Sequence, residues 1–288
     1  MNAIVQARRP ALVGRLNERS RQYRDPLGQI PWDDLDPEAF WLPESLISLH
    51  GLPVYQTLSE IQRRMLSQCE FIAFTELGLW LEALFIQRIS RNVLDVADKS
   101  LDRYEYELHE LREEVGHSLM FLTLIRKSGI PLLTPFRDRP RMAGLFARHA
   151  PYRSAAFWTT IMIGEEVPDQ MNRLIRQQRD LPGAVLGMTQ LHMREEARHM
   201  AYARELLSEK LPRLNRLQRA LLRPLLRRVI HEFIETCFYP SVQVYAAAGL
   251  DNPNDLVRLA RRNPARHALI QRCTAPSLAF LRQHDINI

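Results

Sequence analysis

Cysteine, lysine, glycine and long apolar runs are all scarce in this sequence of 288 residues, and each shortage excludes a class of protein. The three cysteines, Cys69, Cys237 and Cys273, lie far apart and form no Cys-x-x-Cys pair, which argues against a disulfide framework. No stretch approaches the ~20 apolar residues of a membrane-spanning helix. The N-terminal region also lacks the apolar centre of a signal peptide. We therefore expect a soluble, cytoplasmic protein with no membrane partner.

Lysine is nearly absent from a chain that is otherwise basic. Of its 39 basic residues only Lys99, Lys127 and Lys210 are lysines, and the formal net charge is +6. Such a charge can indicate a nucleic-acid-binding protein. The arginines are spread along the chain, however, and no zinc finger, RNA-binding signature or glycine-rich phosphate loop accompanies them. We expect no nucleic-acid partner, although a basic surface also suits an acidic protein such as a carrier domain or a ferredoxin.

Low glycine content and the lack of strand-like alternation predict an all-α chain. A helix is expected from residue 58 to 97, with a possible break near Gly78, and a second one ends at Gly129. A third helix contains Pro168, where a kink or restart is expected. The fourth and fifth are expected over about 184–210 and 214–236, followed by a last short helical region, and no internal repeat of residue identities is expected. The pattern predicts a four-helix bundle core with additional N- and C-terminal helices.

We divide the chain into a polar, arginine-rich N-terminal arm over residues 1–29 and a single domain over residues 30–288. Within that domain, two Glu-x-x-His pairs occur, Glu114–His117 and Glu196–His199. The spacing places the carboxylate and the imidazole of each pair on one helix face. Ferritin-like di-iron bundles use one glutamate from each of two helices and one such pair from each of the other two. Carboxylate and imidazole ligands together suit iron or manganese better than calcium.

The first and third helices each offer two candidates for the remaining glutamates. Glu82 lies on an apolar stripe, where a buried carboxylate needs a partner, whereas the face of Glu76 drifts towards polar residues. Glu165 and Glu166 are adjacent, so only one of them can point inward. Glu165 shares its face with apolar residues and is the preferred candidate. Glu76 and Glu166 remain as alternatives.

One histidine exceeds what a standard di-iron bundle needs. His192 lies one turn before Glu196 and His199, giving the pattern His-x3-Glu-x2-His, and could reach the same metal ion as they do. In this respect the chain resembles the p-aminobenzoate N-oxygenase family of di-iron proteins (AurF-like). The segment "IPWDDLDPEAFWLPESLISLHGLPVY" also resembles the entry segment of that family. The resemblance runs from about residue 30 to at least 205, although the interval from Glu82 to Glu114 is shorter than in the family.

The resemblance implies a non-haem di-iron centre that activates O2 to oxygenate an amine nitrogen in specialised-metabolite biosynthesis. The products would be hydroxylamine, nitroso or nitro compounds. The implied ligands of two iron ions are Glu82, Glu114, His117, Glu165, His192, Glu196 and His199. The implied partners are a small amine or amino-acid-derived substrate, either free or tethered to a carrier protein, an external electron donor and a second copy of the chain. A di-iron C–H oxidase or desaturase is the first alternative, and a non-enzymatic metal-binding bundle is the second.

Overall fold

The computed structural model describes residues 12–93, 100–134 and 140–288, and this part of the chain contains helices and irregular segments but no strand. Four long helices form the bundle: α3 (Glu60–Val93), α4 (Leu101–Ser128), α6 (Ala155–Ile175) and α7 (Gly183–Lys210). The other labelled helices are η1 (Pro26–Gly28), η2 (Trp32–Asp34), η3 (Glu44–Leu46), α2 (Pro53–Thr57), α5 (Arg141–His149), η6 (Leu211–Arg213), α8 (Arg216–Phe238), α9 (Val242–Ala247), α10 (Pro253–Arg261) and α11 (Pro264–Gln283). Residues 12–20 are also helical.

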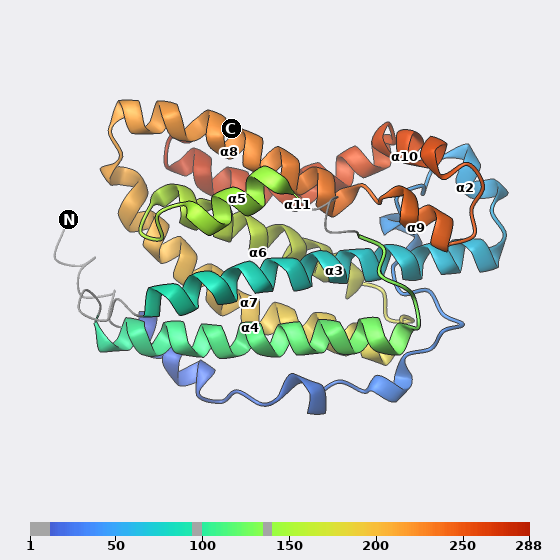
Figure 1. Cartoon of the computed structure of the whole chain (residues 1–288), viewed down its shortest axis with the longest axis horizontal. Helices are drawn as coiled ribbons and strands as arrows, with labels where there is room; N and C mark the ends of the chain where they lie inside the picture. The colour runs from blue at the N-terminus through green and yellow to red at the C-terminus, as the bar shows by residue number, and fades with distance from the viewer. Residues whose placement is uncertain (1–11, 94–99, 135–139) are drawn as a thin grey trace.

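The bundle consists of two helix pairs, α3 with α4 and α6 with α7, whose axes run along the long dimension of the molecule (Figure 1). Local sequence fixes where these helices begin and end. The side chains of Ser100 and Ser154 accept hydrogen bonds from the first turns of α4 and α6. Gly129 ends α4 in the left-handed conformation, with φ of 67°.

Further helices cover two sides of the bundle. Helices α11 and α8 pack against α6 on one side, and α9 and α10 lie at one end of α3 (Figure 1). The N-terminal segment crosses the opposite side, where η1 contacts α4 and η2 contacts α7. Its helical part, residues 12–20, places Val13 and Leu16 in the hydrophobic core. The predicted boundary at residue 29 stays a prediction.

The all-α, ferritin-like fold class is confirmed, and the structure decides three local expectations. Helix α3 passes through Gly78 without a break. Helix α6 continues through Pro168, although proline cannot donate to the carbonyl of Gly164. Helix α11 has 20 residues, so the C-terminal helical region is longer than expected.

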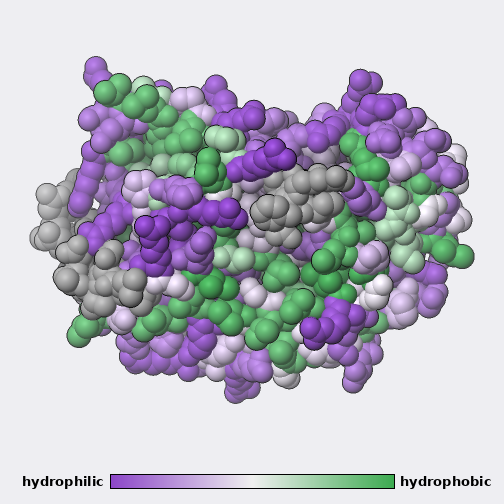
Figure 2. Space-filling view, viewed as in Figure 1, coloured by the Kyte–Doolittle hydropathy of each residue, from purple (hydrophilic) through white to green (hydrophobic). Residues whose placement is uncertain are grey.

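The surface mixes polar and apolar side chains. On the face shown in Figure 2, apolar residues gather over the beginning of α8, where Leu217 and Leu221 are about two-thirds exposed. None of the helices in the described parts of the chain is both long and apolar enough to span a membrane.

Gly78 allows close packing between α3 and α4, which a methyl group would prevent. A Cβ added at Gly78 would lie 2.8 Å from the ring of Phe121. We expect Gly78→Ala to lower the free energy of unfolding by about 1–3 kcal/mol, because overpacking forces the ring to move. The matched control is Gly14→Ala. The added Cβ would have no atom within 4 Å, so this variant should not lower the free energy of unfolding. Urea denaturation of both variants measures the difference, and equal stabilities would contradict the prediction.

Candidate metal centre

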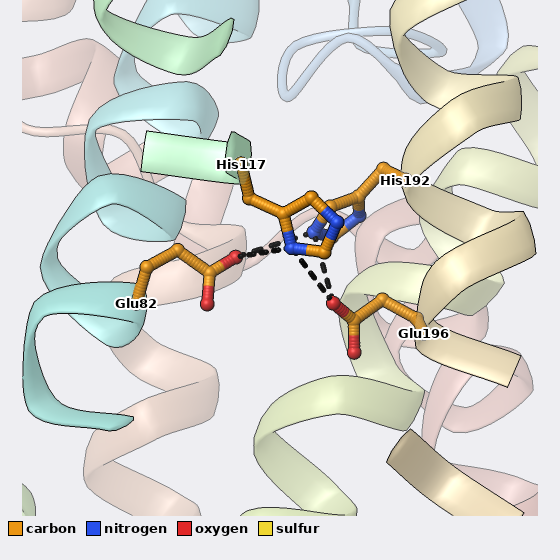
Figure 3. A group of neighbouring side chains, drawn as sticks. All are labelled: Glu82, His117, His192 and Glu196. Carbon is orange, nitrogen blue, oxygen red and sulfur yellow. Dashed lines mark hydrogen bonds and ion pairs between the residues drawn. The ribbon is translucent and has the colours of Figure 1, made fainter. Parts of the chain in front are cut away.

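All seven predicted ligand side chains converge in the middle of the bundle, and each is at least nine-tenths buried. Figure 3 shows four of them, Glu82 from α3, His117 from α4, and His192 and Glu196 from α7, pointing towards one another. Three overlapping groups of donor atoms, each within 4.8 Å of one another, include all seven. These groups are Glu82, His117, His192 and Glu196; Glu82, Glu114 and Glu165; and Glu110, Glu114 and His199.

Two carboxylates lie between the two imidazoles of the Glu-x-x-His pairs. Glu114 places Oε2 3.3 Å from His117 Nδ1 and Oε1 3.1 Å from His199 Nδ1. Glu196 places Oε1 3.2 Å from His117 Nδ1 and Oε2 3.2 Å from His199 Nδ1. Each carboxylate therefore turns one oxygen to each imidazole. This is the arrangement that two metal ions with bridging carboxylates require.

The third histidine lies beside His117 rather than beside His199. His192 Nε2 is 3.3 Å from Glu82 Oε1 and 3.4 Å from Glu196 Oε1. The His192 and His117 rings are 4.6 Å apart between centroids. The extra imidazole is thus on the side of the cluster formed by Glu82 and His117, which differs from the expectation that it could share a metal ion with His199.

Two buried glutamates that sequence reasoning missed orient the imidazoles of the Glu-x-x-His pairs. His117 Nε2 donates to Glu195 Oε2 at 3.0 Å, and His199 Nε2 donates to Glu113 Oε2 at 3.0 Å. Each acceptor lies on the helix opposite to its histidine. A proton fixed on Nε2 leaves the Nδ1 lone pair directed into the cluster, where a metal ion can accept it.

The sequence carried a signal for these two residues. Residues 112–117 read "REEVGH" and residues 194–199 read "REEARH", so both helices contain the pattern Arg-Glu-Glu-x-x-His. The expectation of no internal repeat is therefore wrong over these six positions. In each copy the second glutamate faces the cluster, and the first holds the histidine of the other copy.

Glu110 is a further acidic group that sequence reasoning missed. It lies one turn before Glu114 on α4, is 4% exposed, and groups with Glu114 and His199. Its Oε2 has no hydrogen-bond partner among the described residues. Burial raises its pKa well above the ordinary value. The donor set on the His199 side therefore has one more carboxyl group than the sequence prediction supplied.

The two alternative glutamates have other partners. Glu76 accepts the backbone N–H groups of Leu133 and Thr134, each at 2.7 Å, and so holds the segment after α4. Glu166 forms an ion pair with Arg204 and accepts the hydroxyl of Ser277 at 2.5 Å. The geometry therefore favours Glu82 and Glu165 as ligands.

Burial and the charges of neighbouring groups shift the pKa values of the clustered residues, some upwards and some downwards. Burial and the charge of Glu82 raise the pKa of Glu114 to about 7. Burial also lowers the pKa of His192 to about 4, so this imidazole is neutral at pH 7. It likewise opposes the charged forms of Glu196 and His199, but their mutual attraction outweighs burial, lowering the pKa of Glu196 and raising that of His199. Metal binding must displace protons from His117, His199 and Glu114, whose pKa values are all raised, so metal affinity should already fall as pH decreases towards 7 and should continue to fall below it.

The residues present fit two divalent metal ions. Four carboxylates supply four negative charges, which two divalent cations balance, and three imidazoles add neutral nitrogen donors. Two carboxyl oxygens of the cluster, Glu82 Oε2 and Glu110 Oε2, are buried without a hydrogen-bond partner in the described structure. Such atoms are costly in a dry interior unless a cation satisfies them.

A small apolar cavity of about 30 Å³ adjoins the cluster. Its lining includes Glu82, Glu165 and His192, and its other walls are mainly apolar, with Leu81, Phe121 and Met188 among them. Phe74 and Leu77 line both this cavity and a surface cleft of about 460 Å³. These two side chains thus separate the cluster from the surface.

Removal of Glu195 should weaken metal binding without removing a ligand. We expect Glu195→Ala to lower iron(II) affinity by about 10- to 100-fold, because His117 loses the acceptor that fixes its Nε2 proton. Glu195→Gln should lower the iron(II) affinity less, since an amide oxygen can still accept the hydrogen bond from His117 Nε2. Glu205→Ala, on the same helix outside the cluster, is the control. Anaerobic iron(II) titration measures the affinities, and wild-type affinity in Glu195→Ala would contradict this role.

Comparison with known proteins agrees with this centre. A model of the family described as p-aminobenzoate N-oxygenase AurF matches residues 6–285. Two mycobacterial proteins, the uncharacterized protein Mb0909 of Mycobacterium bovis and the uncharacterized protein Rv0885 of Mycobacterium tuberculosis, are each 27% identical to this chain over 217 residues. The aligned region is 72% of this chain and 63% of each relative.

The family match extends over nearly the whole chain and includes every residue of the cluster. Members of this family are di-iron oxygenases, which agrees with the buried carboxylate and imidazole groups in the bundle. The chain belongs to the AurF family of p-aminobenzoate N-oxygenases.

Proposed function

We propose that this protein is a non-haem di-iron oxygenase that uses O2 to oxygenate the nitrogen of an amine. The product would be a hydroxylamine, nitroso or nitro compound of specialised metabolism. The observation that supports the proposal most strongly is the pair of carboxylates, Glu114 and Glu196, that each turn one oxygen to each of two imidazoles. Two iron ions bound between them would supply the redox chemistry that activates O2.

The chain's own groups would divide the work around the metal ions. Glu82, Glu114, His117, Glu165, His192, Glu196 and His199 would be the ligands. Glu195 and Glu113 would hold the Nε2 protons of His117 and His199, and so keep each Nδ1 lone pair directed at a metal ion. The surrounding apolar side chains would exclude water from the reacting nitrogen.

The apolar lining of the cavity favours an uncharged substrate close to the cluster, and its walls must move apart to admit an aromatic amine, because its volume is only about 30 Å³. The described lining residues include no lysine or arginine. The hydroxyls of Thr75 and Thr189, which also line it, donate to backbone carbonyl oxygens of their own helices. A carboxylate held there would have no lysine or arginine beside it, and the Asn172 amide in the same lining is already hydrogen-bonded to His192, so burying the carboxylate would cost several kcal/mol.

We therefore expect aniline to be oxidised with a kcat/KM at least about tenfold higher than that of p-aminobenzoate. Phe74→Arg should narrow this ratio, because the half-buried position 74 lines the cavity and could present a guanidinium group to the carboxylate. The control is Phe74→Leu, which keeps the wall apolar. Steady-state oxidation of both amines measures the ratio, and equal kcat/KM values for the wild-type protein would contradict this preference.

The same cavity also suits the first alternative, a C–H oxidase or desaturase, because apolar walls accommodate an alkyl or acyl chain. The products distinguish the two reactions, since N-oxygenation adds oxygen at nitrogen, whereas desaturation removes two hydrogen atoms from carbon. Tethering of the substrate to a carrier protein, homodimer formation and a cytoplasmic location remain predictions.

The test of the proposed function begins with anaerobic titration of the metal-free protein with iron(II). We expect about two iron ions per chain. Glu82→Ala should lose at least one of them. Glu76→Ala should keep both, but should be less stable by about 1–3 kcal/mol, because two buried N–H groups lose their acceptor.

The loaded protein is then mixed with O2 and an amine, and the products are identified by mass. A gain of oxygen at nitrogen supports the proposal. Iron binding followed by loss of two hydrogen atoms would instead identify a desaturase. Absence of iron binding, or iron binding without any oxidation, would contradict an oxygenase function.

A further inference from the structure

A strongly basic cleft of about 730 Å³ lies between the N-terminal segment and α7. Five arginines line it, three from the N-terminal segment and two from α7: Arg15, Arg19, Arg24, Arg194 and Arg198. Glu195 is the one carboxylate among its described lining residues. A cleft lined by charges of one sign concentrates the field at its mouth and attracts partners of opposite charge.

Three of these arginines are free to face a partner. Arg15, Arg19 and Arg24 are exposed, and none of them takes part in the ion pairs formed among the described residues. Arg194 is about half-exposed and lies 3.7 Å from Glu195 Oε1. Only Arg198 is buried, and its guanidinium binds Glu113 at 2.9 Å. The cleft therefore presents several positive charges that the chain itself does not neutralise.

The floor of the cleft is connected to the metal centre through single carboxylates. Glu195 accepts from His117 Nε2, and Arg198 binds Glu113, which accepts from His199 Nε2. The cleft-lining Glu195 is thus hydrogen-bonded directly to His117, and one side chain, Glu113, separates Arg198 from His199. A redox partner seated in the cleft would have short connections to both histidines.

The cleft lies on the other side of α7 from the apolar cavity. Met188, Thr189 and His192 line the cavity, whereas Arg194, Ala197 and Ala201 line the cleft, and no described residue lines both. At about 100° per residue, these two sets point in roughly opposite directions from the helix axis. A substrate carried on an acidic carrier domain and entering from the cleft would have to pass through the ligands. The position therefore favours a partner that delivers electrons over one that delivers substrate.

We propose that this basic cleft docks an acidic one-electron carrier protein of the ferredoxin class. The inference rests on the proposed function, in which an amine, O2, two electrons and two protons yield a hydroxylamine and water. Two docking events, each oxidising one reduced carrier, supply the two electrons. The sequence shows no flavin, nicotinamide or iron–sulfur motif that could supply them internally.

The test measures binding and electron delivery separately, with a plant-type [2Fe–2S] ferredoxin as the acidic probe. Binding of oxidised ferredoxin to the metal-free chain is measured by calorimetry at increasing salt. Reduction of the oxidised iron-loaded chain by reduced ferredoxin is then followed optically under anaerobic conditions. The charge-reversal variant Arg15→Glu/Arg19→Glu/Arg24→Glu is compared with Arg227→Glu/Arg228→Glu, which changes two exposed arginines on α8. Iron content and Tm confirm that each variant is folded and loaded.

We expect wild-type affinity and reduction rate to fall steeply with salt, and charge reversal in the cleft to lower both by about tenfold or more at low salt. The α8 variant should behave like the wild-type chain. Neutral replacements at the same three cleft positions, Arg15→Gln/Arg19→Gln/Arg24→Gln, should give an intermediate loss. Ferredoxin that does not bind, or that binds and reduces the cleft variant as well as the wild-type chain, would overturn the proposal. Because binding is measured on the metal-free chain, this failure is distinguishable from failure of the oxygenase function.

Discussion

The central constraint on this protein is the burial of many carboxyl groups inside a helical bundle. Glu82, Glu114, Glu165 and Glu196 share the centre with three imidazoles, and Glu110, Glu113 and Glu195 surround them. Anions in such an interior cost several kcal/mol each unless cations or donors compensate them. Protons on His117 and His199, whose pKa values are raised, provide part of that compensation. Divalent metal ions would compensate the buried carboxylates more completely than these protons do. We therefore expect the metal-free protein to be less stable than the metal-loaded protein.

Arginines beside the buried glutamates also determine how the N-terminal segment packs against the bundle. Arg198 neutralises Glu113, and the motif arginines hold the N-terminal segment against the bundle. Arg112 donates to the carbonyl oxygen of Ser20 and lies over the ring of Tyr23, while Arg194 donates to Gln29. The N-terminal segment thus covers one side of the centre and is held there by Arg112 and Arg194. The residue after each of these arginines, Glu113 or Glu195, orients one imidazole of the cluster. The apolar cavity lies on another side of α7, so the proposed docking cleft and the proposed substrate site are separate.

Much of this arrangement could be predicted from sequence because helical periodicity determines which residues share a face. Apolar periodicity and the glycine and proline boundaries were sufficient to place the four bundle helices in order, and the two Glu-x-x-His pairs with the apolar faces of Glu82 and Glu165 identified the candidate ligands. The roles of Glu113 and Glu195 were harder to predict, because their partners lie on the opposite helix, and one-dimensional spacing carries no information about contacts between helices. The close packing at Gly78 involves the ring of Phe121, which is 43 residues away in sequence. The side of the centre on which His192 lies depends in the same way on packing between helices.

The two copies of the Arg-Glu-Glu-x-x-His motif differ at their fifth position, which is Gly116 in the first and Arg198 in the second. Gly116 leaves room for Tyr23, because a Cβ there would lie 2.5 Å from the tyrosine hydroxyl. Arg198 instead binds Glu113, and His199 and Arg198 together lower the pKa of that glutamate against the effect of burial. Glu195 has no equally close arginine, so it should withdraw the Nε2 proton of His117 more strongly than Glu113 does that of His199. The two imidazoles would then differ in basicity, and the two metal ions that they bind would not be equivalent.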